Sequence, residues 1–292
     1  MNIENKYNKK LNMIMVNKEK CTGCGICKSI CPESCIRIID LKSSINYKYC
    51  TTCTQCIAVC PYLALSWDNN MPVPFNNENL PNSHQIDELL KQRRTTRKFK
   101  KERLNRSLVE EIVQYAIYAP THNFKLRAII VDDAQILNQI DKTVFLYNNK
   151  IYHYLYKPRF IYSLIKLLAP FYEDEYLKAK PKLESSMNIG RAYESMPPVI
   201  IFIVGDKRVP LSQESAQYAI YNVNLYAMTK GLGCRILVGN QMFLNKDKTI
   251  RKIIKLSKNE KIFATIGMGY PDVEFKNKVT GKKIHMQWND QK

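Results

Sequence analysis

The spacing of the cysteines constrains this chain more than any other feature of its sequence. Two runs share the pattern C-x-x-C-x-x-C-x-x-x-C-P, and every cysteine of the first run recurs 29 positions later. Nine of the ten cysteines lie within the first 60 residues. This spacing predicts a small domain built around thiolate-bound iron–sulfur clusters. The first run is Cys21, Cys24, Cys27 and Cys31, and the second is Cys50, Cys53, Cys56 and Cys60.

Two other uses of cysteine fit this pattern poorly. Zinc sites usually take four ligands as two separated C-x-x-C pairs, whereas each run here has three closely spaced cysteines and a fourth. A disulfide framework needs an oxidising compartment. Residues 1–10 are polar and basic, without the apolar segment of a signal peptide, so we expect a reducing, cytoplasmic location. The two cysteines outside the runs, Cys35 and Cys234, are expected to be ordinary small apolar residues.

The two runs resemble those of bacterial ferredoxins, which bind cubane [4Fe–4S] clusters. The resemblance implies two clusters, and it implies that the fourth cysteine of each run crosses over to the other cluster. One expected ligand set is Cys21, Cys24, Cys27 and Cys60. The other is Cys50, Cys53, Cys56 and Cys31.

Composition divides the chain into three parts. The cysteines mark a cluster domain over residues 11–67, and residues 68–82 hold three prolines and many asparagines, which is typical of a linker. Residues 83–292 form a larger, cysteine-poor domain that is long enough to bury a core of its own. No stretch is long and apolar enough to span a membrane, so we expect no membrane partner.

The formal net charge is +19 and the sequence pI is about 9.4. Two explanations remain open: a compositional bias of the genome, and steering of an acidic partner or anionic substrate. The sequence contains no recognised DNA- or RNA-binding module, and its charge is spread along the chain. A nucleic-acid partner is therefore not expected.

Hydrophobic periodicity in the larger part predicts a mixture of helices and strands, typical of an α+β or α/β core. A helix is predicted from Ser83, and a second from Ser107, where Ser107 and Glu110 have the spacing of a capping box. A long helix should end just before Gly231, because glycine readily adopts the left-handed conformation that follows many helices. The predicted strands are 127–131, 199–204 and 262–268, with shorter ones at 11–16, 36–39 and 63–67.

Four segments of the larger part resemble, in order, segments of the FMN-dependent nitroreductase family. They are R-R-T-T-R-K-F at 93–99, A-P-T-H-N at 119–123, G-L-G-C-R-I-L-V-G at 231–239 and I-G-M-G-Y-P at 266–271. The whole chain is thus similar to ferredoxin–nitroreductase fusion proteins. The resemblance implies an α+β fold, a small two-cluster ferredoxin domain followed by a nitroreductase-like α+β sandwich. It also implies a homodimer that seats each FMN at the subunit interface.

The resemblance assigns the FMN site. The basic segment suits a phosphate dianion, because guanidinium groups bind phosphate with paired hydrogen bonds and a hydroxyl adds another donor. Basic residues at a helix C-terminus are also favoured by the helix dipole alone. The backbone N–H of Val238 is the candidate donor to flavin N5. The implied FMN-binding residues are Arg93, Arg94, Thr95, Arg97, Pro120, Thr121, Asn123, Ile236, Val238, Gly239 and Lys282.

The function expected from these features is oxidoreduction. Electrons would pass from a low-potential donor through two [4Fe–4S] clusters to FMN and then to a small electron-poor acceptor, such as a nitroaromatic, a quinone or an activated alkene. The donor would be an acidic ferredoxin or flavodoxin, or NAD(P)H. Two alternatives stay open: reductive dehalogenation or a cofactor-biosynthetic reduction on the same fold, and electron transfer or redox sensing without small-molecule turnover. No catalytic side chain is assigned, since lone histidines such as His122 and His153 are more often structural.

Overall fold

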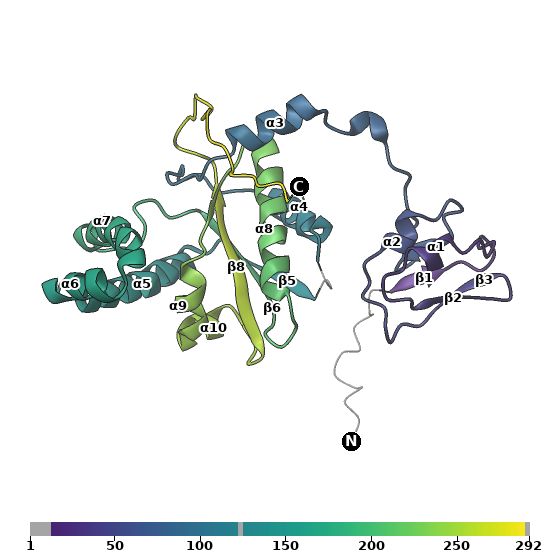
Figure 1. The fold of residues 1–292 in the computed structure, drawn as a ribbon, viewed down its shortest axis with the longest axis horizontal. Coiled ribbons are helices and arrows are strands. Elements are labelled where there is room, and N and C mark those ends of the chain that lie inside the picture. The colour runs from purple at the N-terminus through teal and green to yellow at the C-terminus, as the bar shows by residue number, and fades with distance from the viewer. Residues whose placement is uncertain (1–12, 122–124, 290–292) are drawn as a thin grey trace, which may run out of the picture. The chain divides into compact units, whose positions relative to one another are not determined.

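The computed structural model describes residues 13–121 and 125–289, and these divide into two compact units that meet in sequence after residue 80. Figure 1 traces the chain through both units. The predicted domain and linker boundaries at 67 and 83 stay predictions, and the predicted strand residue Leu11 and the site residue Asn123 lie outside the described residues. No helix in the described part is long and apolar enough to cross a bilayer.

The first unit consists of two small antiparallel strand pairs and two one-turn helices, which repeat once along the chain. β1 pairs with β4 at the ends of the unit, and β2 pairs with β3 in a hairpin between the two cysteine runs. A compact core of Ile14, Ile36 and Leu65 with several cysteines holds them together. The elements are β1 (Ile14–Val16), α1 (Ile26–Ser29), β2 (Ile36–Ile39), β3 (Lys42–Ile45), α2 (Gln55–Ala58) and β4 (Leu65–Trp67).

The second unit is built on an antiparallel sheet of four strands in the order β5-β6-β8-β7. β6 carries the apolar run V-I-I-F-I-V and is buried along almost its whole length, because helices cover both faces of the sheet. This agrees with the predicted α+β sandwich. The strands are β5 (Leu126–Val131), β6 (Val199–Asp206), β7 (Gly233–Ile236) and β8 (Glu260–Gly269).

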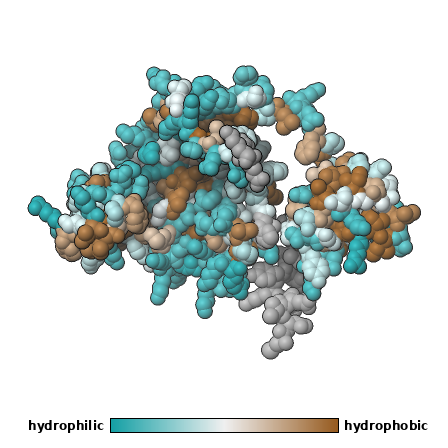
Figure 2. Space-filling view, in the orientation of Figure 1, coloured by the Kyte–Doolittle hydropathy of each residue, from teal (hydrophilic) through white to brown (hydrophobic). Residues whose placement is uncertain are grey.

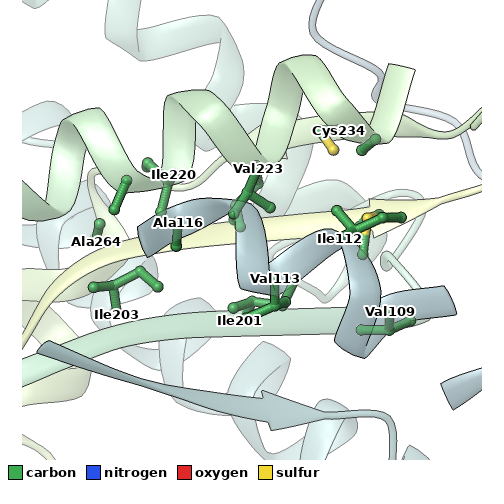
Figure 3. Close-up of a cluster of buried hydrophobic side chains, with 14 of the residues drawn as sticks. Val109, Ile112, Val113, Ala116, Ile201, Ile203, Ile220, Val223, Cys234 and Ala264 are labelled. Atoms are coloured by element: carbon green, nitrogen blue, oxygen red, sulfur yellow. The ribbon is translucent and has the colours of Figure 1, made fainter. Parts of the chain in front are cut away.

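Two hydrophobic layers lie on opposite faces of this sheet. On one face α4 and α8 pack on alternate residues of β6 and β8, and Figure 3 shows Ile220 and Val223 of α8 above the strands that carry Ile201 and Ala264. On the other face α5, α9 and α10 cover the remaining side chains, with Phe202 at the centre. The helices are α3 (Ser83–Gln92), α4 (Arg106–Gln114), α5 (Ala134–Ile151), α6 (Arg159–Leu168), α7 (Glu173–Ile189), α8 (Ser212–Thr229), α9 (Asn240–Lys246) and α10 (Lys248–Ile253).

The helix ends follow local capping chemistry, and one of the predicted helix caps is wrong. α3 begins at Ser83 as predicted, with a capping box between Asn82 and Gln85. α4 does not begin with a Ser107 cap. The side chain of Asn105 accepts the hydrogen bond from the Ser107 backbone N–H, so Asn105 is the N-cap and Ser107 lies inside the helix. Asparagine caps at least as well as serine, which explains the shift.

The predicted end of the long helix is confirmed. α8 runs to Thr229, and Gly231 follows with a φ of +72°, the left-handed conformation that ends helices without a steric penalty in glycine.

The helical region between α5 and α7 leaves several apolar side chains exposed to solvent. α5 continues into a π-helical turn, η4 (Tyr152–Tyr156), before α6 begins. On and beside α6, Phe160, Leu167 and Phe171 are 68%, 76% and 87% exposed. Figure 2 shows this apolar surface at the α6 end of the second unit.

The segment after α3 packs along the sheet through one close contact. The Thr96 N–H donates to the Cys234 carbonyl of β7 at 2.9 Å, and a Cβ atom on Gly233 would lie 2.2 Å from Thr96 Oγ1. Further along, the Lys100 N–H donates to the Tyr270 carbonyl just beyond β8. Only glycine at position 233 allows this approach.

We therefore expect Gly233→Ala to lower the free energy of unfolding by about 1–3 kcal/mol, the usual cost of overpacking. Urea unfolding measures it. Gly239→Ala is the matched control, because Gly239 has an ordinary helical φ of −62° and open space where a Cβ would go. Replacing Thr96 by glycine in the Gly233→Ala background should recover part of the loss. Equal stabilities of the two alanine variants would contradict the close-contact explanation.

Candidate functional site

The eight cysteines of the two runs line two separate hollows in the first unit. In each hollow three cysteines come from one run and the fourth comes from the other run. The first hollow is lined by Cys21, Cys24, Cys27 and Cys60, and the second by Cys50, Cys53, Cys56 and Cys31.

The backbone of both cysteine loops turns through the left-handed region at equivalent positions. In the first loop these positions are Gly23 and Gly25, with φ of +72° and +81°. In the second loop they are Thr52 and Thr54, with φ of +58° and +62°. β-branched residues rarely adopt this conformation. The loop shape is therefore kept in the second run although the glycines are not.

Three backbone N–H groups donate to cysteine sulfurs that line the hollows. Ser43 donates to Cys21 Sγ at 3.2 Å, and Ala64 donates to Cys60 Sγ at 3.3 Å. In the second run, Thr52 donates to Cys50 Sγ at 3.4 Å. Hydrogen bonds of this kind stabilise thiolates and tune the iron–sulfur clusters that they bind.

The thiols also need a cation to ionise together. Burial, and then the neighbouring Cys53 and Cys50, raise the pKa of the Cys56 thiol to about 12. Thiolates crowded into one hollow repel each other unless a metal centre neutralises them. Sulfur ligands, backbone donors and crowding together fit a thiolate-bound cluster in each hollow.

The predicted phosphate-binding residues lie where α3 ends and the chain turns along β7. Arg93 is the C-cap of α3 and is half-buried. The Arg94 guanidinium donates to the carbonyls of Lys91 and Arg93, so it caps the helix. Thr95 forms an isolated parallel bridge with Cys234. Arg97 follows on the exposed side of this segment. The role of these residues in binding stays a prediction.

Three cations from separate elements converge beside this segment. Burial and the positive charges of Arg235 and Arg97 lower the pKa of Lys182 on α7. Burial lowers the pKa of Arg235 as well, and Arg97 adds to this shift. The Arg235 guanidinium lies 4.8 Å from the centre of the Tyr193 ring, which supports it from below. We call Arg97, Lys182 and Arg235 the cation cluster.

Within residues 13–121 and 125–289, no member of the cation cluster forms an ion pair with a carboxylate. Arg235 is half-buried, whereas Arg97 and Lys182 are exposed, and like charges held close together repel each other unless an anion joins them. The cluster therefore has the electrostatics of a binding site for a phosphate or carboxylate. Sequence spacing did not indicate Lys182 or Arg235, since they are 53 residues apart and α7 carries no recognised motif.

The end of β7 provides further groups suited to a polar, flat ligand. Val238 is 58% exposed, and its backbone N–H donates no hydrogen bond to another described residue. Gly239 faces open space. Just beyond, the side-chain nitrogens of Asn240 and Gln241 are buried without a hydrogen-bond partner in the described part of the chain. Buried amides without partners are rare in proteins and are often explained by an absent ligand or water. Ile236 packs at the edge of the α8-side core.

The remaining residues predicted to bind FMN do not lie beside the cation cluster in a single chain. Ala119, next to Pro120, is buried in the core under α8, whereas Tyr193 beneath Arg235 belongs to the core on the opposite face of the sheet. Thr121 is half-buried, and it is the last described residue before the gap. Lys282 lies exposed in the C-terminal segment. Pro120 and the cation cluster therefore lie on different faces of the sheet.

Comparisons with known proteins match both parts of the chain. Residues 90–270 match the model of the nitroreductase family, and residues 13–61 match that of a 4Fe–4S dicluster domain. A solved nitroreductase with bound FMN from Desulfitobacterium hafniense is 13% identical, with 71% of this chain and 100% of that chain covered at a TM-score of 0.51. Another with bound FMN, from Bacteroides fragilis, is 14% identical with the same coverage and a TM-score of 0.49. No curated protein matches the chain.

The cation cluster makes a prediction about pH. Because the pKa of Lys182 is lowered on folding, its charge destabilises the ligand-free protein below the folded pKa. This penalty disappears as the pH rises above the unfolded value of about 10.4. Lys182→Met should therefore stabilise the ligand-free protein at neutral pH, and the gain should vanish above that value. Urea unfolding at several pH values measures both.

Lys178 on the same helix is the matched control with the opposite sign. A hydrogen bond to Glu175, and then the charges of Glu175 and Asp174, raise the pKa of Lys178. Its charge therefore adds stability below the unfolded pKa, and this contribution is lost as the pH rises through the folded pKa. Lys178→Met should slightly destabilise the protein at neutral pH. Destabilisation by Lys182→Met as well would show that the cation cluster already has an anionic partner in the chain.

Proposed function

The chain belongs to the nitroreductase family, and we propose that it passes electrons from a low-potential donor through two [4Fe–4S] clusters to FMN and on to a small electron-poor acceptor. Nitroaromatics, quinones and activated alkenes are acceptors of this kind. The observation that carries the proposal is the arrangement of eight cysteines in two hollows of four, with one cysteine of each run crossing over. It supports two clusters held side by side in a single small unit, ahead of the flavin enzyme.

The chain offers residues that fit FMN at the end of β7. The cation cluster, with Arg93 and Thr95 beside it, would hold the phosphate dianion by charge-assisted hydrogen bonds. The free N–H of Val238 would face the reactive edge of the ring, and the buried amides of Asn240 and Gln241 would meet its polar edge. When bound, FMN supplies the change from one-electron to hydride chemistry. We assign no side-chain acid, in keeping with a site built from backbone donors and cations.

A homodimer is part of the proposal. Ala119, beside Pro120, and Tyr193, beside Arg235, belong to cores on opposite faces of one sheet, which favours a site to which two chains contribute. β5 is at the edge of the sheet, with no described strand on its outer side. The exposed apolar side chains of α6 and of the C-terminal segment, where Ile284, Met286 and Trp288 alternate in position, also favour burial against a second copy.

The charge distribution favours an acidic donor protein. Residues 81–292 hold 36 Lys and Arg against 20 Asp and Glu, whereas residues 13–80 hold 6 against 5. The surplus therefore lies mostly in the second unit. An acidic ferredoxin or flavodoxin would be steered to such a surface, while NAD(P)H remains a second possible donor. Thiols in such number also favour a reducing, cytoplasmic location.

Removal of the second cluster tests the electron route. We expect Cys53→Ala to abolish acceptor reduction driven by reduced ferredoxin, because the electron would lose one of its two relay centres. The same variant should keep turnover driven by dithionite or by NAD(P)H acting on the flavin. Steady-state rates under anaerobic conditions, at matched flavin content, measure both activities. Iron and sulfide should fall from about eight to about four of each per chain, as loss of one cubane cluster requires.

Cys234→Ala is the control for the loss of a thiol, because this cysteine is buried in the core of the second unit, far from any predicted cluster ligand in sequence. Equal ferredoxin-driven rates in Cys53→Ala and the unaltered protein would show that the first unit is not the electron entry route. Absence of turnover with every acceptor class, together with normal flavin reduction, would favour electron transfer or redox sensing as the function.

The phosphate assignment makes a separate prediction. Arg97→Ala should weaken FMN binding by about 1–3 kcal/mol, or roughly five- to 150-fold, because a hydrogen bond to a charged group is lost. Fluorescence titration of the flavin-free protein measures the affinity. Arg103→Ala, an exposed arginine of the same unit, is the control. Unchanged FMN affinity in an Arg93, Arg97 and Lys182 triple variant would show that the FMN phosphate does not bind at the cation cluster.

A further inference from the structure

The second hollow contains a fifth cysteine. Cys35 is 6% exposed and lines the same hollow as Cys31, Cys50, Cys53 and Cys56. Its Sγ lies 3.4 Å from Cys31 Sγ, within hydrogen-bond distance for sulfur. Cys35 is a buried member of the core of the first unit, and its thiol also lies among the four sulfurs of the second hollow.

The internal repeat shows that this thiol distinguishes the two hollows. Cys35 follows the crossing cysteine Cys31 by four residues, and the position equivalent to it in the second run, 29 residues on, is Ala64. Ala64 lines the first hollow, four residues after the crossing cysteine Cys60. At this position one hollow has a thiol where the other has a methyl group, and in the first hollow it is the backbone N–H of Ala64 that donates to the crossing sulfur, Cys60 Sγ, at 3.3 Å.

The direction of the hydrogen bond follows from the chemistry of the ligand. A cysteine that binds iron does so as a thiolate, which has no proton to donate. If Cys31 binds the cluster, only the Cys35 S–H can donate in this pair. We propose that the Cys35 thiol donates a hydrogen bond to the Cys31 thiolate and raises the reduction potential of the second cluster above the value it would have without this donor. This inference rests on the proposed two-cluster function.

The effect on potential follows from charge. One-electron reduction adds a negative charge to the cluster and its sulfur ligands, and no bond to a ligand is made or broken. A donor to a ligand sulfur stabilises the more negative, reduced state, so the potential rises. In the first hollow the crossing sulfur, Cys60 Sγ, accepts instead from the Ala64 backbone N–H, so the effect of the Cys35 thiol is measured against the second cluster without it.

Redox titration of the full chain, followed by electron paramagnetic resonance, tests the proposal. Cys35→Ala should lower the reduction potential of the second cluster only. The expected shift is up to about 59 mV, which for a one-electron couple is a tenfold change in the equilibrium constant for reduction. Cys35→Ser, which keeps an O–H donor of similar size, should keep the reduction potential of the second cluster close to that of the unaltered protein. Ala64→Cys should raise the potential of the other cluster by introducing the same donor there.

Iron and sulfide analysis separates the possible failures. Eight iron atoms in the unaltered protein and in Cys35→Ala, with unchanged potentials, would overturn the donor role while leaving the two-cluster function intact. Iron loss in Cys35→Ala with full iron in Cys31→Ala would make Cys35 itself the iron ligand, which also overturns it. About four iron atoms in the unaltered protein would instead overturn the proposed function on which the inference rests.

Discussion

The close approach of Thr96 to Gly233 is the contact on which the arrangement of the second unit depends. The hydrogen bond from Thr96 to Cys234 adds the segment after α3 to the edge of β7, and further bonds continue this pairing beyond β8. Because Gly233 has no side chain, the two backbones can lie this near. The contact places Arg97 beside Arg235, so a steric detail of the fold creates the electrostatics of the site.

The repulsion among these cations makes the ligand-free site electrostatically unfavourable. Arg97, Lys182 and Arg235 come from three different elements, and none has a carboxylate partner in the described part of the chain. An anion would turn their mutual repulsion into attraction, so its binding would stabilise the approach of Lys182 on α7 to Arg235 on β7. Binding of this kind links the affinity for the ligand directly to the stability of the native state.

The sequence predicted local features better than distant ones. The cysteine runs could be read directly, since ligands three residues apart are brought together by the loop that contains them. The start of α3 and the glycine after α8 were equally local. The cap of α4 was misassigned because Asn105 and Ser107 are both good caps, and only the backbone geometry decides between them. β3, the helices from α5 to α7, and the roles of Lys182 and Arg235 depend on tertiary contacts that no spacing reveals.

The threonines in the second cysteine loop have a consequence for how the first unit matures. Thr52 and Thr54 hold left-handed backbone conformations that cost about 1–3 kcal/mol each, whereas Gly23 and Gly25 adopt them freely in the first loop. Before iron arrives, the first loop is thus closer to its final shape than the second. Because metal binding supplies folding free energy, the two halves of the repeat should not acquire their clusters with equal ease.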